Sequence, residues 1–149
     1  MAPLPLPQPD PVTRPYWESL RAHALALQWC VTCQTPVFYP RPVCPRCWGS
    51  HLEWRPASGR GSLYSFTIVH RAPSPELQAT VPYVVALVDL EEGVRLMATL
   101  RDVAPDPEAL RIGMPLELVY DDVSAEVTLP RFRPASLRDG GAAAQQQGR

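Results

Sequence analysis

All four cysteines of this chain lie in one short stretch, CVTCQTPVFYPRPVCPRC, where they form two C-x-x-C pairs. Two thiolates separated by two residues can reach one metal ion from a single tight turn, and backbone N–H groups of that turn point at the sulfurs. Two such turns that face each other predict tetrahedral coordination by four thiolates, with bonds of about 2.3 Å to zinc. The predicted ligands are Cys30, Cys33, Cys44 and Cys47.

The predicted metal is zinc, and its predicted role is structural. Four protein ligands leave no coordination position open for water or a substrate. A module of this size cannot fold on its own core, so the bound metal is expected to supply the folding free energy. Iron, as in rubredoxin, is a less favoured alternative, because nothing else in the sequence indicates an electron carrier or a flavin site. Disulfides are less favoured still in a chain without a secretory signal.

Composition and charge exclude several classes of protein. The 149 residues suffice for one ordinary domain, or for two small units that share a core. A formal charge of −1 provides no general attraction to nucleic acid or to anionic membranes. No stretch approaches the roughly 20 apolar residues that span a bilayer, and the N-terminal MAPLPLP lacks the basic residue and the apolar core of a secretory signal. We therefore expect a cytoplasmic protein without a membrane or nucleic-acid partner.

The hydrophobic pattern and the prolines divide the chain into segments. Thr13 is expected to cap a helix that ends near Ala24, with Trp17, Leu20 and Ala24 as its apolar stripe. The proline-rich start and the GGAAAQQQGR end are expected to be disordered. The predicted organisation is a disordered segment over 1–12, the helix and a lead-in strand over 13–29, the zinc ribbon over 30–56, an OB-fold over 57–134 and a disordered tail over 135–149.

The prediction of an OB-fold rests on the strand pattern of residues 57–134. Residues 89–93 are expected to form a hairpin turn, and residues 106–113 a single capped helical turn. Five short strands, with a long first strand and a helical turn before the fourth, favour a mainly β fold that closes into a small barrel, whereas a β-sandwich would need more strands. The expected strands are 63–69, 83–88, 94–100, 116–120 and 125–129.

The sequence holds no recognisable catalytic constellation. It has no phosphate-binding loop, nucleophile elbow or H-E-x-x-H motif, and the absence of lysine excludes Schiff-base chemistry by this chain. Asp121 and Asp122 are expected to be solvated turn residues at the end of the fourth strand. The three histidines are isolated in the sequence and are expected in turns or on the surface; they are His23, His51 and His70.

Tryptophans and arginines surround the cysteines. Trp29, Trp48 and Trp54 are expected to cover the ribbon and its junction with the barrel. Four arginines make residues 30–60 locally basic, which indicates a solvated face or a site that receives a phosphate group. These arginines are Arg41, Arg46, Arg55 and Arg60.

Residues 16 to about 134 resemble a family of bacterial and archaeal proteins that join a rubredoxin-like zinc ribbon to an OB-fold. The family was long classed as a domain of unknown function and is described as acyl-CoA-associated. Gln34 departs from the family pattern, which usually has glycine after the second cysteine to relieve a left-handed backbone angle. The matching segments are YWESL, CVTC, YPRPVCPRC, HLEWRPASGRGSLYSFTIVH, VPYVVALVDLEEGVRLMATL, IGMPLELVY and LPRFRPA.

The resemblance implies a non-catalytic accessory subunit. Family members are encoded beside thiolase-like enzymes, bind them and support their folding, their activity or their CoA channel. The enzymes include thiolases, hydroxymethylglutaryl-CoA synthase assemblies and aldolases that cut side chains from steroid acyl-CoA thioesters. A dimeric partner would bind one copy of this chain per subunit, which predicts a two-plus-two heterotetramer. Tyr16, Trp48 and Phe132 mark the three candidate docking surfaces.

Two other functions remain open to the sequence. OB-folds and zinc ribbons also bind single-stranded nucleic acid, but such sites need a positive groove with stacking aromatic side chains. Residues 61–149 carry 8 arginines and 12 acidic residues, a balance of −4, which disfavours this function. An independent acyl-CoA carrier or hydrolase is also disfavoured, because no base or nucleophile can be named.

Overall fold

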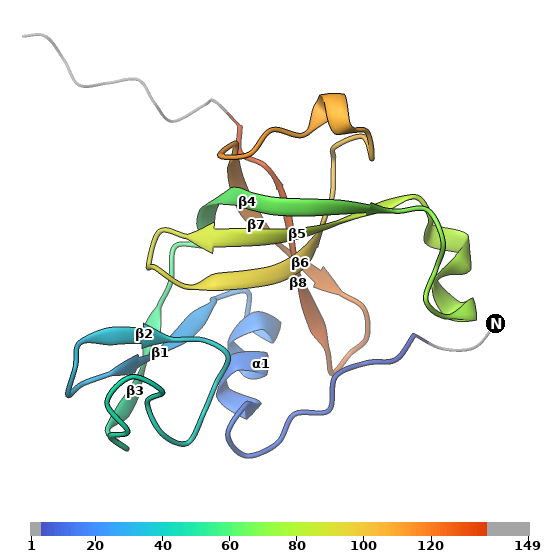
Figure 1. Ribbon diagram of the computed structural model, residues 1–149. Helices are drawn as coiled ribbons and strands as arrows, with labels where there is room; N and C mark the ends of the chain where they lie inside the picture. Colours follow the sequence, from blue (N-terminus) through green and yellow to red (C-terminus); the bar gives the residue numbers. More distant parts are fainter. Residues whose placement is uncertain (1–3, 137–149) are drawn as a thin grey trace, which may run out of the picture.

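A computed structural model describes residues 4–136 as one helix, a three-stranded sheet and a five-stranded closed barrel (Figure 1). The elements follow one another along the chain with two short 3₁₀ helices, η1 and η2, between barrel strands. Their bounds are α1 Arg14–Arg21, β1 Ala26–Cys30, β2 Thr35–Val37, β3 Leu52–Pro56, β4 Arg60–Val69, η1 Pro75–Thr80, β5 Tyr83–Leu90, β6 Arg95–Leu100, η2 Pro107–Ala109, β7 Pro115–Asp122 and β8 Thr128–Pro134.

The barrel has the strand order β4-β5-β6-β8-β7 and closes through pairing of β4 with β7. All neighbouring strands are antiparallel except β6 and β8, which run parallel. This order is that of the predicted OB-fold, so the predicted fold class is confirmed. Along β5 the burial alternates, and the inward side chains are Val84, Ala86, Val88 and Leu90.

The turns predicted within the barrel are present. Gly93 has φ +96° in the β5–β6 hairpin, and Gly113 has φ +84° after η2. Asp106 begins η2, where its side chain accepts a hydrogen bond from the backbone N–H of Glu108 at 2.8 Å. The prediction for the last strand was wrong in position: β8 begins at Thr128, because a tight turn closed by the carbonyl of Val127 takes up most of the predicted run.

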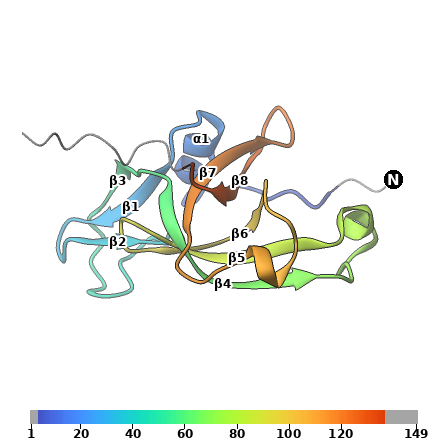
Figure 2. The ribbon, with the colours of Figure 1, turned by 90° about the horizontal axis from the view of Figure 1, so that it is seen from above.

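Helix α1 belongs to the barrel's hydrophobic core. It lies against β7 and β8 (Figure 2), and Tyr16 and Leu20 are buried among barrel side chains. Of the predicted stripe, Leu20 is confirmed, whereas Tyr16 is buried in place of the partly buried Trp17, and Ala24 is exposed. The helix ends at Arg21 rather than near Ala24.

The start of α1 also differs from the prediction. Thr13 occupies the N-cap position, but its side chain makes no capping bond and its hydroxyl accepts the N–H of Asp10 at 3.0 Å. The Asp10 carboxylate instead accepts the N–H groups of Val12 and Thr13 at 2.9 and 2.8 Å. A turn before the helix therefore replaces the expected cap.

The ribbon is a sheet of order β2-β1-β3 beneath the barrel (Figure 1). Its small core, formed by Cys30, Val37 and Cys44 with Cys33 and Leu52 against it, is separate from the core that joins α1 to the barrel. No helix within residues 4–136 is long and apolar enough to cross a bilayer. The predicted disorder of 1–3 and 137–149 lies outside the described residues, and residues 4–10 form no helix or strand.

Candidate metal centre

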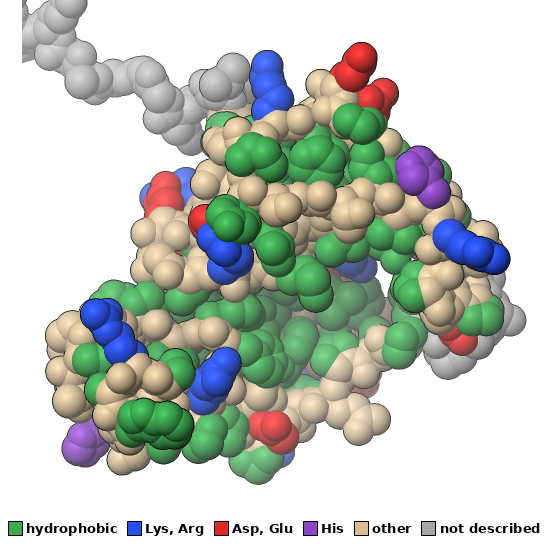
Figure 3. All heavy atoms as spheres, in the orientation of Figure 1, with side chains coloured by type: hydrophobic (Ala, Val, Ile, Leu, Met, Phe, Trp, Pro, Cys, Tyr) green, Lys and Arg blue, Asp and Glu red, His purple; other side chains and the backbone are tan. Residues whose placement is uncertain are grey.

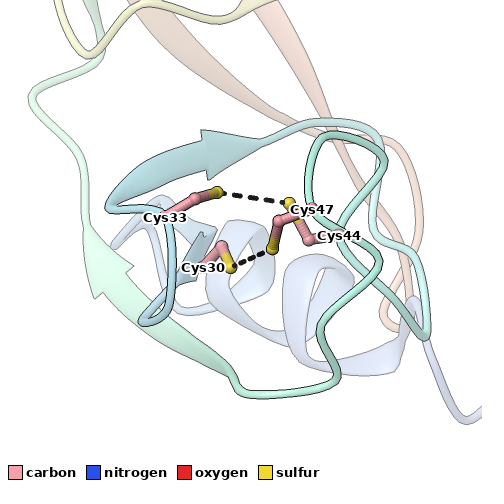
Figure 4. Close-up of side chains that lie close together, drawn as sticks. All are labelled: Cys30, Cys33, Cys44 and Cys47. Atoms are coloured by element: carbon pink, nitrogen blue, oxygen red, sulfur yellow. Dashed lines mark hydrogen bonds between the residues drawn. The ribbon is translucent and has the colours of Figure 1, made fainter.

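Two tight turns bring the four cysteine side chains together. Cys30 ends β1 and Cys33 precedes β2, whereas Cys44 and Cys47 lie in the loop before β3. Figure 4 shows all four side chains pointing toward a common centre. The four sulfurs lie within 4.8 Å of one another, with Cys30–Cys47 at 3.5 Å and Cys33–Cys44 at 3.6 Å.

This arrangement fits one tetrahedral metal ion. Four sulfurs at about 2.3 Å from a central zinc would lie roughly 3.8 Å from one another, close to the separations between these thiols. Thiolates are the soft ligands that zinc and iron accept in such sites. All four positions would be filled by protein, so the four cysteines form a structural metal site with no place for a substrate.

Backbone hydrogen bonds lower the pKa of the Cys30 and Cys44 thiols. The pKa of the Cys44 thiol is lowered to about 6, chiefly by the backbone N–H of Cys47 and further by that of Arg46. The backbone N–H of Cys33 is the main reason that the pKa of Cys30 is also lowered. The pKa of Cys47 is raised to about 12, because its neighbouring thiols and burial outweigh the bond from the Gly49 N–H. Four thiolates this close need a cation between them.

The two turns share one backbone feature. The residue after the second cysteine has a positive φ in both turns, +54° at Gln34 and +62° at Trp48. The left-handed angle predicted at Gln34 is therefore confirmed. In place of glycine's freedom, the Gln34 side chain donates to the carbonyl of Val31 at 2.6 Å and accepts the Trp29 indole N–H at 3.3 Å.

The structure separates the three candidate docking residues. Tyr16 is 2% exposed and Phe132 is fully buried, so neither side chain can reach a partner while this core is intact. Both point inward because the α1 stripe and the β8 alternation turn them to the barrel core. Trp48 is 78% exposed, which corrects the expectation that it covers the ribbon. Trp29 and Trp54 are partly buried, as a cover for the ribbon junction requires.

The four arginines near the ribbon do not form one phosphate site. Arg55 pairs with Glu53 and stacks over Trp29, while Arg60 pairs with Glu91 at 3.2 Å. Arg41 and Arg46 form no ion pair with any residue in 4–136. A hollow of about 370 Å³ separates the ribbon from the β5–β6 turn, and Arg46 lies on its wall.

One polar cluster was not anticipated from the sequence. His23 donates to Asp122 at 2.9 Å and stacks on Tyr120 at 4.8 Å between ring centroids. The pKa of Asp122 lies below its usual value, chiefly because Thr128 donates to it at 2.6 Å and then because of His23. Asp121 and Asp122 occupy the last positions of β7 rather than a turn, and of the two only Asp122 is exposed as expected. The cluster fastens the end of α1 to the barrel.

Family models match most of the described chain. The model "ChsH2, rubredoxin-like zinc ribbon domain" matches residues 17–53, and the model "ChsH2, C-terminal OB-fold domain" matches residues 54–121. A DUF35 domain-containing scaffold protein from Pyrococcus furiosus is 41% identical over 104 residues, which are 66% of this chain and 74% of that protein. The chain belongs to the DUF35 family.

A solved structure agrees with this assignment. A chain of an "Ltp2-ChsH2(DUF35) aldolase" matches with a TM-score of 0.77 and 37% identity, covering 88% of this chain and 100% of that one. A benzoylsuccinyl-CoA thiolase subunit BbsA from Thauera aromatica is 36% identical over 73 residues, 48% of this chain and 47% of that protein.

The comparisons also include longer proteins. A probable enoyl-CoA hydratase alpha subunit from Thermomonospora curvata is 40% identical over 120 residues, which are 80% of this chain. This DUF35 chain spans only 36% of that protein's length, and 38% of a related hydratase alpha subunit from Mycobacterium tuberculosis. The family is thus found as small proteins and as parts of larger subunits.

Proposed function

We propose that this DUF35 protein is a non-catalytic accessory subunit of a thiolase-like enzyme that acts on acyl-CoA thioesters. The observation that carries the proposal is the match over the whole length of the DUF35 chain in a two-component aldolase. The relative named as a thiolase subunit supports the same class of partner. Lipid or steroid side-chain degradation is the proposed setting, in the cytoplasm.

The site chemistry is consistent with an accessory role. The cysteines would be taken up by the metal. The half-exposed His23–Asp122 pair is bonded to Thr128, whose hydroxyl is a potential nucleophile but belongs to a side chain that is only 2% exposed and out of reach of a substrate. This cluster within residues 4–136 therefore offers no accessible nucleophile beside a base. The partner enzyme would therefore carry the reacting groups.

Zinc is the proposed metal, held by Cys30, Cys33, Cys44 and Cys47. The ion would link the two turns through its coordination bonds to the four sulfurs and would take no part in catalysis. Iron is the alternative for the same ligands, and elemental analysis separates the two. This chain would thus present a rigid surface to its partner, which lowers the entropy lost on association.

The proposed assembly has two copies of each subunit. A dimeric thiolase-like enzyme presents every docking patch twice, so one copy of this chain would bind to each subunit. The test is co-expression with a thiolase-like protein of the same organism, followed by light scattering and an acyl-CoA turnover assay. Co-elution as a two-plus-two species, with turnover lost when the partner's active site is mutated, is the expected result.

Two outcomes would contradict the proposal. The first is a partner that is fully soluble and equally active without this chain and never co-elutes with it. The second is thiolytic, hydrolytic or retro-aldol turnover by the isolated chain that disappears when one of its own residues is mutated.

A further inference from the structure

The two cysteine turns have equivalent residues, Gln34 and Trp48, whose side chains make different contacts. Gln34 and Trp48 each follow the second cysteine of a turn, and both have a left-handed backbone. Such a φ is unfavourable for a side chain with a Cβ and is adopted most easily by glycine. A bulky residue kept at such a position needs a compensating role.

The side chain of Gln34 compensates for its left-handed backbone by hydrogen bonds within the first turn. Its amide bonds the carbonyl of Val31 and the indole of Trp29, so it stiffens the first turn. Trp48 has no equivalent bond: only its backbone N–H is used, donating to the carbonyl of Cys44 at 2.9 Å. The indole is 78% exposed, the highest value among the exposed large hydrophobic side chains of residues 4–136. Within residues 4–136, neither burial nor a hydrogen bond of the indole therefore accounts for tryptophan at this position.

Two arginines without an ion-pair partner in the described chain lie near Trp48 in the sequence, and one carboxylate, that of Glu92, lines the same hollow as Arg46. Residues 30–52 contain Arg41 and Arg46 and no acidic residue. Neither arginine has an ion-pair partner within the part of the chain that the structure describes. Figure 3 shows two basic side chains among hydrophobic ones over the ribbon, at lower left, with an acidic side chain at the lower edge of this face. A partner complementary to this surface must be acidic around an apolar centre.

A second group of exposed apolar side chains, on the barrel, has its neighbouring charges already paired. On the outside of β4–β6, Met97 is 70% exposed and Tyr64 is 48% exposed. Arg95 lies 3.3 Å above the Tyr64 ring and pairs with Asp89 at 2.6 Å, so the local charges are already neutralised. This face offers a hydrophobic contact but no free charge to orient a partner, which makes Met97 a suitable control.

We propose that the second cysteine turn, residues 44–49, is the docking surface for the thiolase-like partner, with Trp48 as its central anchor and Arg46 at its rim. This inference rests on the proposed function and adds the place of contact. The partner patch is an apolar pocket that receives the indole and is bordered by carboxylates. Tryptophan and arginine are the residue types on which binding energy concentrates at protein interfaces.

Single-stranded nucleic acid is the less favoured occupant of the same surface. Stacking platforms for single strands place several aromatic side chains along a positive groove. Here one indole stands beside two arginines, in a chain of net charge −1. The surface thus has the composition of a protein anchor with a charged rim.

The experiment compares two glycine substitutions at the equivalent positions, Trp48→Gly and Gln34→Gly. Each variant is bound, in low and high salt, to the purified, immobilised thiolase-like subunit used in the co-expression test. Glycine suits the left-handed angle, so Trp48→Gly is expected to melt at the same temperature as the wild type or higher and to keep its metal. Its dissociation constant is nevertheless expected to rise at least about 30-fold, the loss typical of a hot-spot truncation.

Further variants test the charge of the docking surface and its location on the molecule. Arg46→Glu is expected to weaken binding about tenfold in low salt, with a smaller effect in high salt, because rim charges act mainly on association. Gln34→Gly and Met97→Ala are expected to bind within about threefold of the wild type.

The outcomes distinguish this inference from the proposed function. Wild-type binding that survives Trp48→Gly overturns the docking surface and leaves the accessory role intact. Wild-type binding that is lost in Met97→Ala moves the interface to the barrel. If the wild type does not bind the thiolase-like subunit, both proposals fail. In that case, Trp48-dependent binding of an oligo(dT) single strand would assign the surface to nucleic acid.

Discussion

Removal of the metal should open the ribbon and leave the barrel folded. Apart from the ligands, the ribbon core contains only Val37, fully buried, and Leu52, partly buried. Burying two such side chains provides roughly 3–6 kcal/mol. Ordering the backbone of even six residues costs about 6–12 kcal/mol, and the segment from Cys30 to Cys47 is longer than that. Structural zinc in small modules contributes about 10–16 kcal/mol, so the ribbon depends on it.

The barrel does not share this dependence. Its core joins β4–β8 to α1 through residues such as Leu20, Leu63 and Phe132, none of which belongs to the ribbon cluster. Strand β1 connects the two parts, because Leu27 packs in the barrel core while Cys30 ends in the metal site. Phe38 and Trp54 of the ribbon also pack against the barrel core. Loss of the metal should therefore unfold the turns and β2 first, and β1 only toward its end.

Hydrogen exchange read by mass spectrometry measures this directly. After chelation, amides of residues 31–51 should exchange at rates close to those of an unfolded chain, while β5 and β6 keep their protection. Cys44→Ser should give the same pattern, whereas Thr32→Ala, an exposed non-ligand in the first turn, should not. Re-addition of zinc should restore protection in the chelated wild type only.

Two results would refute this reasoning. One is a barrel that exchanges as fast as the ribbon after chelation, since that would mean that the two cores are one cooperative unit. The other is protein expressed with ample metal that contains neither zinc nor iron and still protects residues 31–51.

Four further predictions concern the barrel and can be checked by thermal or denaturant melting. A Cβ at Gly61 would collide with the carbonyl oxygen of Asp89 at the point where β4 pairs with both β5 and β7; Gly61→Ala should therefore cost about 2–3 kcal/mol, and an unchanged melting temperature would contradict it. At Gly113, with φ +84° and nothing within 4 Å of a Cβ, alanine should cost only about 1–2 kcal/mol. Phe132→Ala should cost about 3–5 kcal/mol, because the side chain is fully buried, and a loss below 1 kcal/mol would exclude it from the core. Asp122→Asn removes a carboxylate whose pKa is lowered from 3.8 by the hydrogen bonds from Thr128 and His23. The variant should therefore be less stable than the wild type at neutral pH, and the two stabilities should converge as the pH falls below 3.8 and the wild-type carboxylate is protonated. A stability difference that persists at low pH would argue against the charge of Asp122 as its cause.

Local chemistry was readable from the sequence wherever the interacting residues are close along the chain. The C-x-x-C spacing predicted four converging thiols, and the position of Gln34 predicted its left-handed backbone, because both depend on one turn. Alternating side chains predicted β4–β7 and the OB-fold, since a strand with one buried face must repeat every two residues. The position of β8 was missed, because Pro130 and Pro134 lie within it and proline argues against a strand.

The tertiary structure decided which side chains are hidden and which are free. From the sequence, Tyr16, Trp48 and Phe132 were equivalent candidates for a partner surface, because an aromatic side chain can pack inward or outward with the same local pattern. Phe132 is buried in the barrel core, and Tyr16 is buried by the rings of Phe38 and Tyr39 and by the packing of α1 on the barrel. His23 and Asp122, 99 residues apart, meet only because that packing brings the end of the helix to the end of β7. Contacts of this range depend on the whole fold, whereas a metal turn depends only on its own few residues.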